Sequence, residues 1–222
     1  CKADLITSAV VEFTSLQGIM GGHYARFSGE TPEVALGITD HYRPRFADDD
    51  LPRNLAGTVT AFSDKLDTIC GIFAIGAGPT GSSDPFALRR AAIGIVNILL
   101  SGLDVSLSEL IDVALGNYRD VVDFDFDAVR DQVRAFFATR LEVIARDRGY
   151  APDCIAAVMA TGMFEPAETI ARIDALVVVV DGGIMTNVRS EVLDDASKPI
   201  PGLYAVGLDG AMLWRNVYTQ NM

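Results

Sequence analysis

The sequence predicts a mainly α-helical protein that ends in a short β-rich segment. Two observations carry this prediction. Through most of the 222 residues, apolar side chains recur every three or four positions, the spacing that stacks side chains on one face of a helix. At Val177 this spacing gives way to a β-branched run followed by a glycine turn, a pattern that is typical of strands.

The first predicted helix covers residues 4–20, where five apolar side chains have helical spacing: Ile6, Val10, Phe13, Leu16 and Met20. Gly21 and Gly22 are expected to loosen or end this helix. A second helix is expected over residues 31–42, because a hydroxyl cap, a proline and an acid follow one another at its start.

The clearest apolar period predicts a long buried helix with the side chains Leu55, Val59, Phe62, Leu66, Ile69 and Phe73 on its inner face. A loop rich in glycine and proline over residues 76–81 should close it. Asp84 and Pro85 then start a helix that is expected to carry Arg89 and Arg90 in its second turn.

The next helix is predicted to begin at a capping box, in which Ser106 and Glu109 satisfy free amide groups at the helix start. Asp125 opens the longest predicted helix, and Gly149 ends it. Shorter helices are expected over residues 152–161 and 166–176.

The tail is expected to contain strands over residues 177–180, 184–193 and 203–206, separated by turns over 181–183 and 194–201. The sequence therefore divides into a helical domain, residues 1–176, and a β-rich tail, residues 177–222. We do not expect the tail to be an independent domain.

Composition excludes several classes of protein. With 50% hydrophobic and 22% charged residues, the chain is globular rather than disordered. Charged residues or glycine interrupt every apolar run well short of the roughly 20 residues that span a bilayer, so no membrane partner is expected. The formal net charge of −12 excludes generic nucleic-acid binding over the whole surface, and any RNA contact must come from a local basic patch.

The three cysteines, Cys1, Cys70 and Cys154, have no metal-ligand spacing and lie among apolar residues. We interpret them as reduced, buried thiols, which favours a cytoplasmic protein. The chain begins at Cys1 without an initiator methionine, and we expect it to be an excerpt of something longer.

Asp64 and Asp67 lie three residues apart on the long helix, so their carboxylates point to nearly the same side, as metal binding or acid–base catalysis requires. A helical metal phosphohydrolase of the HD type also needs an adjacent His-Asp pair. Neither His23 nor His41 precedes an aspartate. We therefore favour a structural or partner-binding role for both carboxylates, and we expect no metal site.

The loop and helix start over residues 78–90 offer an anion site, because amides at a helix N-terminus lie near Arg89 and Arg90. The loop lacks the Lys-Ser/Thr ending of a phosphate-binding P-loop. A plain helix connection with solvated arginines explains the same residues equally well. No Ser/His/Asp or Cys/His set can be assembled, so no catalytic residue is assigned.

Five motifs occur in one order and at fitting spacing: residues 2–7 (KADLIT), 12–21 (EFTSLQGIMG), 23–26 (HYAR), 64–73 (DKLDTICGIF) and 79–92 (PTGSSDPFALRRAA). Together they resemble the beta subunit of bacterial glycyl-tRNA synthetase, over about residues 1–176. The resemblance implies a tetramer in which the alpha subunit aminoacylates with ATP and Mg²⁺ while beta grips tRNA(Gly) and supports alpha. It also implies an HD-like helical domain that has lost its metal-binding histidines, and no cofactor bound by this part.

Carried over position by position, the family motifs imply that Lys65, Arg89 and Arg90 contact the tRNA backbone or hold the domain together. Arg43 and Arg45 match a family segment, HYRPRF, and are candidates to extend the basic patch. The Asp-Pro pair that commonly follows a lysine in the family follows a serine here, which removes one charge able to bind phosphate.

Three motifs in the tail, residues 182–187 (GGIMTN), 191–193 (EVL) and 198–207 (KPIPGLYAVG), resemble the end of FAD-dependent fumarate reductases and 3-ketosteroid dehydrogenases. That resemblance implies that Gly207 and Asp209 lie at a flavin. FAD binding also needs an N-terminal Rossmann unit, which the helical pattern does not predict, so FAD is not expected to bind. The chain resembles a mosaic of two unrelated fragments, and a joined reading frame is the favoured interpretation. An FAD-dependent oxidoreductase is the alternative function.

Overall fold

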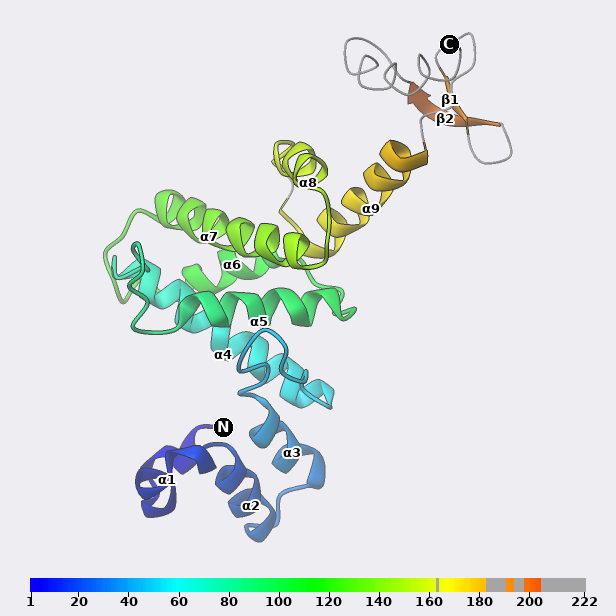
Figure 1. Cartoon of the computed structure of the whole chain (residues 1–222). Helices are drawn as coiled ribbons and strands as arrows, with labels where there is room; N and C mark the ends of the chain where they lie inside the picture. Colours follow the sequence, from blue (N-terminus) through cyan, green and yellow to red (C-terminus); the bar gives the residue numbers. More distant parts are fainter. Residues whose placement is uncertain (163, 183–190, 194–197, 205–222) are drawn as a thin grey trace.

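The computed structural model describes residues 1–162, 164–182, 191–193 and 198–204, and most of them are helical (Figure 1). The helical elements are η1 (Ala3–Ile6), α1 (Ser8–Glu12), η2 (Thr14–Leu16), α2 (Ile19–Phe27), α3 (Pro32–Asp40), α4 (Leu55–Ala74), α5 (Leu88–Leu100), α6 (Leu107–Gly116), α7 (Phe126–Asp147), α8 (Pro152–Met159) and α9 (Pro166–Gly182). Two strands follow, β1 (Glu191–Leu193) and β2 (Pro199–Tyr204), and they pair antiparallel. The prediction of a mainly helical protein is confirmed.

The apolar core lies among α4, α5, α6 and α7, which stack in the middle of the molecule (Figure 1). Each of these helices contributes fully buried side chains, including Ile69, Ile95, Ile111, Val133 and Phe137. The apolar stripe of α4 is buried from Phe62 to Phe73, as its spacing predicts. Leu55 and Val59, in the first turns, are exposed instead.

Three predicted helix starts are confirmed by their capping hydrogen bonds. The side chains of Thr31, Ser106 and Asp125 each accept a hydrogen bond from the backbone N–H three residues further on. The end of α3 at Asp40 comes two residues before the predicted one. Helix starts are therefore readable from local sequence, because the cap and the amide that it satisfies lie within one turn.

The single helix predicted over residues 4–20 is wrong. The segment is broken into η1, α1 and η2, and of its five periodic apolar side chains only Val10 is buried. The physical reason is Asp4, whose buried carboxylate accepts hydrogen bonds from the N–H groups of Gly18, at 2.7 Å, and Gly21, at 3.0 Å. The chain must fold back on itself to bring these amides to Asp4, and a straight helix would keep them apart.

The expectation that Gly21 and Gly22 loosen or end a helix is also wrong, because both lie inside α2. Gly22 is buried where α2 packs on α3. A Cβ atom there would collide with the Thr39 side chain and would lie 2.9 Å from the Ala35 carbonyl oxygen. Glycine therefore permits the close approach of two helices at this position.

The predicted strand over residues 177–180 is wrong, because α9 continues through these residues to Gly182. The first two residues of the predicted turn, 181 and 182, are therefore helical as well. Val177 packs against the core while Val178 is exposed. Extending a helix that already exists costs less than starting a new element, so the β-branched preference does not decide the outcome here.

Further along the tail, β1 lies within the predicted strand 184–193, whereas β2 begins inside the predicted turn 194–201. The remainder of the predicted tail strands and turns, together with Gly207 and Asp209, lies outside the described residues.

Two of the three cysteines, Cys70 and Cys154, are buried free thiols, but Cys1 is exposed, contrary to expectation. Burial raises the pKa of the Cys70 thiol to about 12, with a smaller contribution from the charge of Asp67. Within the part of the chain that the structure describes, no helix combines the length and the apolar character needed to cross a membrane.

Candidate nucleic-acid interface

A cavity of about 660 Å³ lies between the N-terminal helices and the pair α4–α5. Three of the five basic residues predicted as tRNA contacts line it, namely Arg45, Lys65 and Arg90. They come from the loop after α3, from the middle of α4 and from the first turn of α5. The structure thus brings together residues that are up to 45 positions apart in the sequence.

Lys65 is buried and its ammonium group is fully engaged. The Nζ atom donates to the backbone carbonyls of His41, Tyr42 and Arg43, at 3.2, 3.2 and 3.0 Å. Burial lowers the pKa of Lys65 to about 8, and the nearby Asp64 opposes the shift. These contacts fix the end of α3 to α4, so the geometry gives Lys65 a part in holding the domain together.

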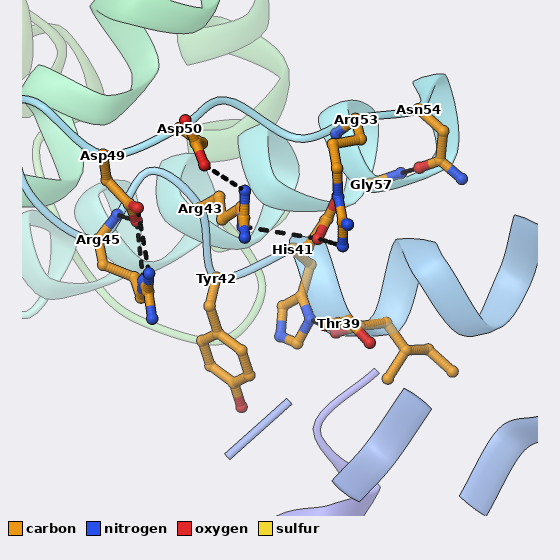
Figure 2. Close-up of polar contacts among 12 residues, drawn as sticks. Thr39, His41, Tyr42, Arg43, Arg45, Asp49, Asp50, Arg53, Asn54 and Gly57 are labelled. Atoms are coloured by element: carbon orange, nitrogen blue, oxygen red, sulfur yellow. Dashed lines mark hydrogen bonds and ion pairs between the residues drawn. The ribbon is translucent and has the colours of Figure 1, made fainter. Parts of the chain in front are cut away.

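The segment after α3 is held by carboxylates around Arg43 and Arg53 (Figure 2). Asp40, with no exposed surface, accepts two hydrogen bonds of 2.8 Å from the Arg53 guanidinium and one of 2.9 Å from its backbone N–H. Arg43 lies 3.6 Å from Asp40 and 3.1 Å from Asp50. Burial alone would raise the pKa of Asp40, but these hydrogen bonds and charges outweigh it and lower the pKa.

Arg45 has a carboxylate partner as well. Its guanidinium donates to both oxygens of Asp49, at 2.8 and 3.1 Å, and its backbone N–H adds a third bond of 2.8 Å (Figure 2). The hydrogen bond from the Arg45 side chain is the main reason why the pKa of Asp49 lies far below its usual range. Carboxylates therefore already compensate the charges of Arg43 and Arg45, and the part of these residues in a basic patch stays a prediction.

At the start of α5 the chain caps its own helix. Asp84 accepts hydrogen bonds from the N–H groups of Leu88, at 2.8 Å, and Arg89, at 3.0 Å, so these two amides are not free for an anion. The predicted helix start at Asp84 and Pro85 is wrong, because α5 begins at Leu88 after Ala87 in a left-handed conformation. Arg89 and Arg90 therefore lie in the first turn rather than the predicted second. Residues 76–81 (GAGPTG) have the glycine spacing of a dinucleotide-binding loop, but they follow helix α4 and not a strand.

The two arginines of this turn differ. Arg89 donates to the Gly81 carbonyl oxygen at 2.5 Å, whereas Arg90 is exposed and makes no hydrogen bond or ion pair within the described residues. Neither has a carboxylate partner there, which sets them apart from Arg43 and Arg45. Among the predicted contacts, these two side chains keep an uncompensated charge near the surface.

Sequence reasoning missed a third arginine beside them. Arg140 of α7 lies 3.9 Å from the centre of the Phe136 ring and donates to the Phe136 carbonyl oxygen. Burial lowers the pKa of Arg140 and the positive charge of Arg89 lowers it further, while the negative charge of Asp84 opposes the shift. No carboxylate pairs with Arg140 in the described part of the chain. No local signal could reveal this neighbour, because it depends on how α5 packs on α7.

The carboxylates of Asp64 and Asp67 both have partners within the chain. Asp64 pairs with Lys2 at 2.6 Å, and the Tyr118 hydroxyl donates to Asp67 at 2.9 Å. His23 is exposed, and His41 is buried with its Nδ1 atom 2.6 Å from the Ile38 carbonyl oxygen. Across residues 1–162 and the other described stretches, no three potential His, Cys, Asp or Glu ligands cluster as a metal site would need.

Comparison with known proteins identifies the family. A family model described as "Glycyl-tRNA synthetase beta subunit" matches residues 1–160. The chain is 45% identical over 177 residues to the glycine–tRNA ligase beta subunit of Acidithiobacillus ferrooxidans, covering 79% of this chain and 26% of the relative. It is 48% identical over 174 residues to that of Desulforamulus reducens, covering 77% and 25% respectively.

The chain therefore spans about a quarter of the length of the curated relatives that it matches. The family match includes the loop before α4, α4 itself and the first turn of α5, where the candidate basic residues lie. On these similarities, the chain belongs to the glycyl-tRNA synthetase beta subunit family.

Proposed function

We propose that this chain is a tRNA-supporting segment of a glycine–tRNA ligase beta subunit, whose alpha partner carries out aminoacylation with ATP and Mg²⁺. The proposal extends to tRNA(Gly) as the bound RNA, to the cytoplasm as the location and to an HD-like origin for the helical domain. Family membership supports the assignment to the subunit.

The single structural observation that carries RNA binding is the pair of arginines at the start of α5 together with Arg140 of α7. Arg89, Arg90 and Arg140 have no carboxylate partner among the described residues, although the chain as a whole has a net charge of −12. Phosphate groups are the natural partners of such guanidinium groups. A local patch of this kind is what an acidic protein needs in order to hold an RNA backbone.

The experiment measures tRNA(Gly) binding by a complete beta subunit carrying this segment, in complex with its alpha subunit, across a range of salt concentrations. Arg89→Ala plus Arg90→Ala should weaken binding and lower the slope of log affinity against log salt by roughly one to two. Arg146→Ala plus Arg148→Ala, at the exposed end of α7, is the matched control with the same change of charge. An unchanged slope in the first variant would remove the patch from the RNA interface.

A further inference from the structure

The cavity between the N-terminal helices and α4–α5 differs in charge from the rest of the protein. Four cationic side chains line it, Lys2, Arg45, Lys65 and Arg90, against one carboxylate, Asp64. The chain as a whole carries 30 acidic and 18 basic residues. A cationic cavity in an acidic protein concentrates anions, because the potential inside a hollow follows the charge of its lining.

Carboxylates compensate only part of this charge. Asp64 pairs with Lys2, and Asp49, which is not one of the lining residues, pairs with Arg45. Lys65 donates only to neutral carbonyl oxygens, and Arg90 has no partner within the described residues. About two positive charges are therefore left without a carboxylate, and of these two side chains only Arg90 has donors free for a ligand. A phosphate monoester or the phosphates of a short nucleotide chain would balance this charge.

The other walls of the cavity suit a nucleoside. Phe86 lines it with about half of its surface exposed, next to the apolar side chains of Pro44 and Ala91. The hydroxyls of Thr14 and Ser15 also line it and make no side-chain hydrogen bond in the described part of the chain. An exposed aromatic face stacks on a base of any sequence, and free hydroxyls bind sugar hydroxyls.

We propose that this cavity binds a nucleoside phosphate unit, with the phosphate at Arg90 and the base against Phe86. The volume of about 660 Å³ is within the range of small-molecule sites and leaves room for one nucleotide with its waters. The unit has two sources, a free nucleotide or one nucleotide of a single-stranded RNA. This site extends the proposed function without depending on it, because a free mononucleotide can occupy the cavity when no tRNA is bound.

The test titrates the full 222-residue chain with each of the four ribonucleoside 5′-monophosphates, with ribose 5-phosphate, with inorganic phosphate and with a single-stranded RNA trinucleotide. Binding is followed by calorimetry and by NMR. Arg90→Gln should weaken nucleotide binding about tenfold, as expected for loss of one charge-assisted hydrogen bond. Phe86→Leu, which keeps an apolar side chain and removes the aromatic face, should weaken it about fivefold.

Two controls isolate the site. Arg148→Gln removes an exposed arginine at the end of α7, outside the cavity lining, and should leave nucleotide affinity unchanged. Ribose 5-phosphate and inorganic phosphate should bind more weakly than the monophosphates and should not respond to Phe86→Leu, since neither has a base.

The outcomes separate clearly. Mononucleotide binding that both cavity variants weaken supports the proposal with a free nucleotide as the source. Trinucleotide binding with the same sensitivities, in the absence of mononucleotide binding, supports it with RNA as the source. Equal affinity for inorganic phosphate, or the same loss in Arg148→Gln, overturns it, and so does the absence of binding at millimolar concentration. The tRNA titration of the complete complex reports on the proposed function separately, because it measures the salt dependence of tRNA(Gly) binding by the Arg89→Ala plus Arg90→Ala variant.

Discussion

The α4–α7 bundle and the N-terminal region, residues 1–53, are held together by different kinds of contact. In the bundle, apolar stripes with helical spacing meet in one core. In the N-terminal region, buried polar groups make the decisive contacts: Asp4 with amides at the start of α2, Asp40 with Arg53, and Lys65 with the carbonyls after α3. Apolar contacts are not directional, so the bundle can accept small shifts in how its side chains pack. Each buried polar contact, in contrast, requires one particular partner in one position.

The largest expected effect is a cavity in the bundle. Phe137 is 1% exposed and packs near Phe136 and Phe164. Phe137→Ala should lower the free energy of unfolding by about 4 kcal/mol, because buried apolar surface is lost and a cavity is left. Urea unfolding of the full chain measures it. Phe27→Ala, at a side chain that is 89% exposed, is the control and should change stability by less than about 0.5 kcal/mol.

The second-largest effect is expected at Lys65, whose polar contacts hold the N-terminal region to α4. Lys65→Met keeps the length of the side chain but leaves the carbonyls of His41, Tyr42 and Arg43 without their donor. We expect a loss of about 3 kcal/mol, since relief of the buried charge offsets only part of that cost. Lys2→Met removes an exposed ion pair and should cost less than about 1 kcal/mol.

Hydrogen exchange shows where that loss falls. In Lys65→Met, amides of α2 and α3 should lose protection while those of α7 keep it, because the lost contacts join the N-terminal region to α4. Equal loss of protection in all helices would show that the bundle and the N-terminal region unfold as one unit, despite their different kinds of contact.

A smaller effect is expected at Asp40. Asp40→Asn retains one acceptor but removes the charge that holds Arg53, whose side chain is about half exposed. The free energy of unfolding should fall by about 2 kcal/mol near neutral pH. Asp48→Asn, at an exposed aspartate of the same loop, should leave it unchanged. Comparable losses in the two variants would trace the effect to the net charge of the loop rather than to the buried contact.

The smallest effect depends on pH. Glu165, between α8 and α9, accepts hydrogen bonds from the Ser106 hydroxyl and from the N–H groups of Leu107 and Ser108. Burial would raise its pKa, but these bonds outweigh burial and lower the pKa from its usual 4.5. The contribution of the carboxylate to stability is therefore complete above pH 4.5, and it is lost as the pH falls through the lower folded value.

Glu165→Gln should accordingly reduce stability by about 1 kcal/mol at pH 7 and by less at pH 3. Urea unfolding at both pH values measures the difference. Glu168→Gln, which removes only the exposed pair with Arg172, should show no such pH dependence. An equal loss at both pH values in Glu165→Gln would mean that the charge of Glu165 does not matter.

Local sequence was enough to predict the elements in which cause and effect lie within a turn or two. Thr31 and Asp125 cap the helices that they were expected to cap, and the apolar stripe of α4 is buried from Phe62 to Phe73. Local sequence failed where a distant partner decides. Asp4 breaks the first predicted helix by binding amides 14 and 17 residues away. The helical state of residues 177–180 likewise depends on the helix that precedes them.

The candidate interface was also only partly predictable from local sequence. The motifs indicated Arg89 and Arg90, which the structure places near the surface without carboxylate partners among the described residues, and their role in RNA binding stays a prediction. The engagement of Lys65 with backbone carbonyls and the position of Arg140 beside Arg89 required the tertiary fold. Charge and motif suggest which side chains can bind phosphate, but only packing shows which of them are available.

The bonds from Glu165 to the start of α6 also define where the molecule can be cut. The family match ends at residue 160, yet Glu165 and the buried Ile170 and Ile173 lie beyond that point and complete the packing of the bundle. A piece ending at residue 160 would expose the apolar faces that these side chains cover and leave amides of α6 open to water. The smallest piece that keeps these contacts must extend at least through Ile173.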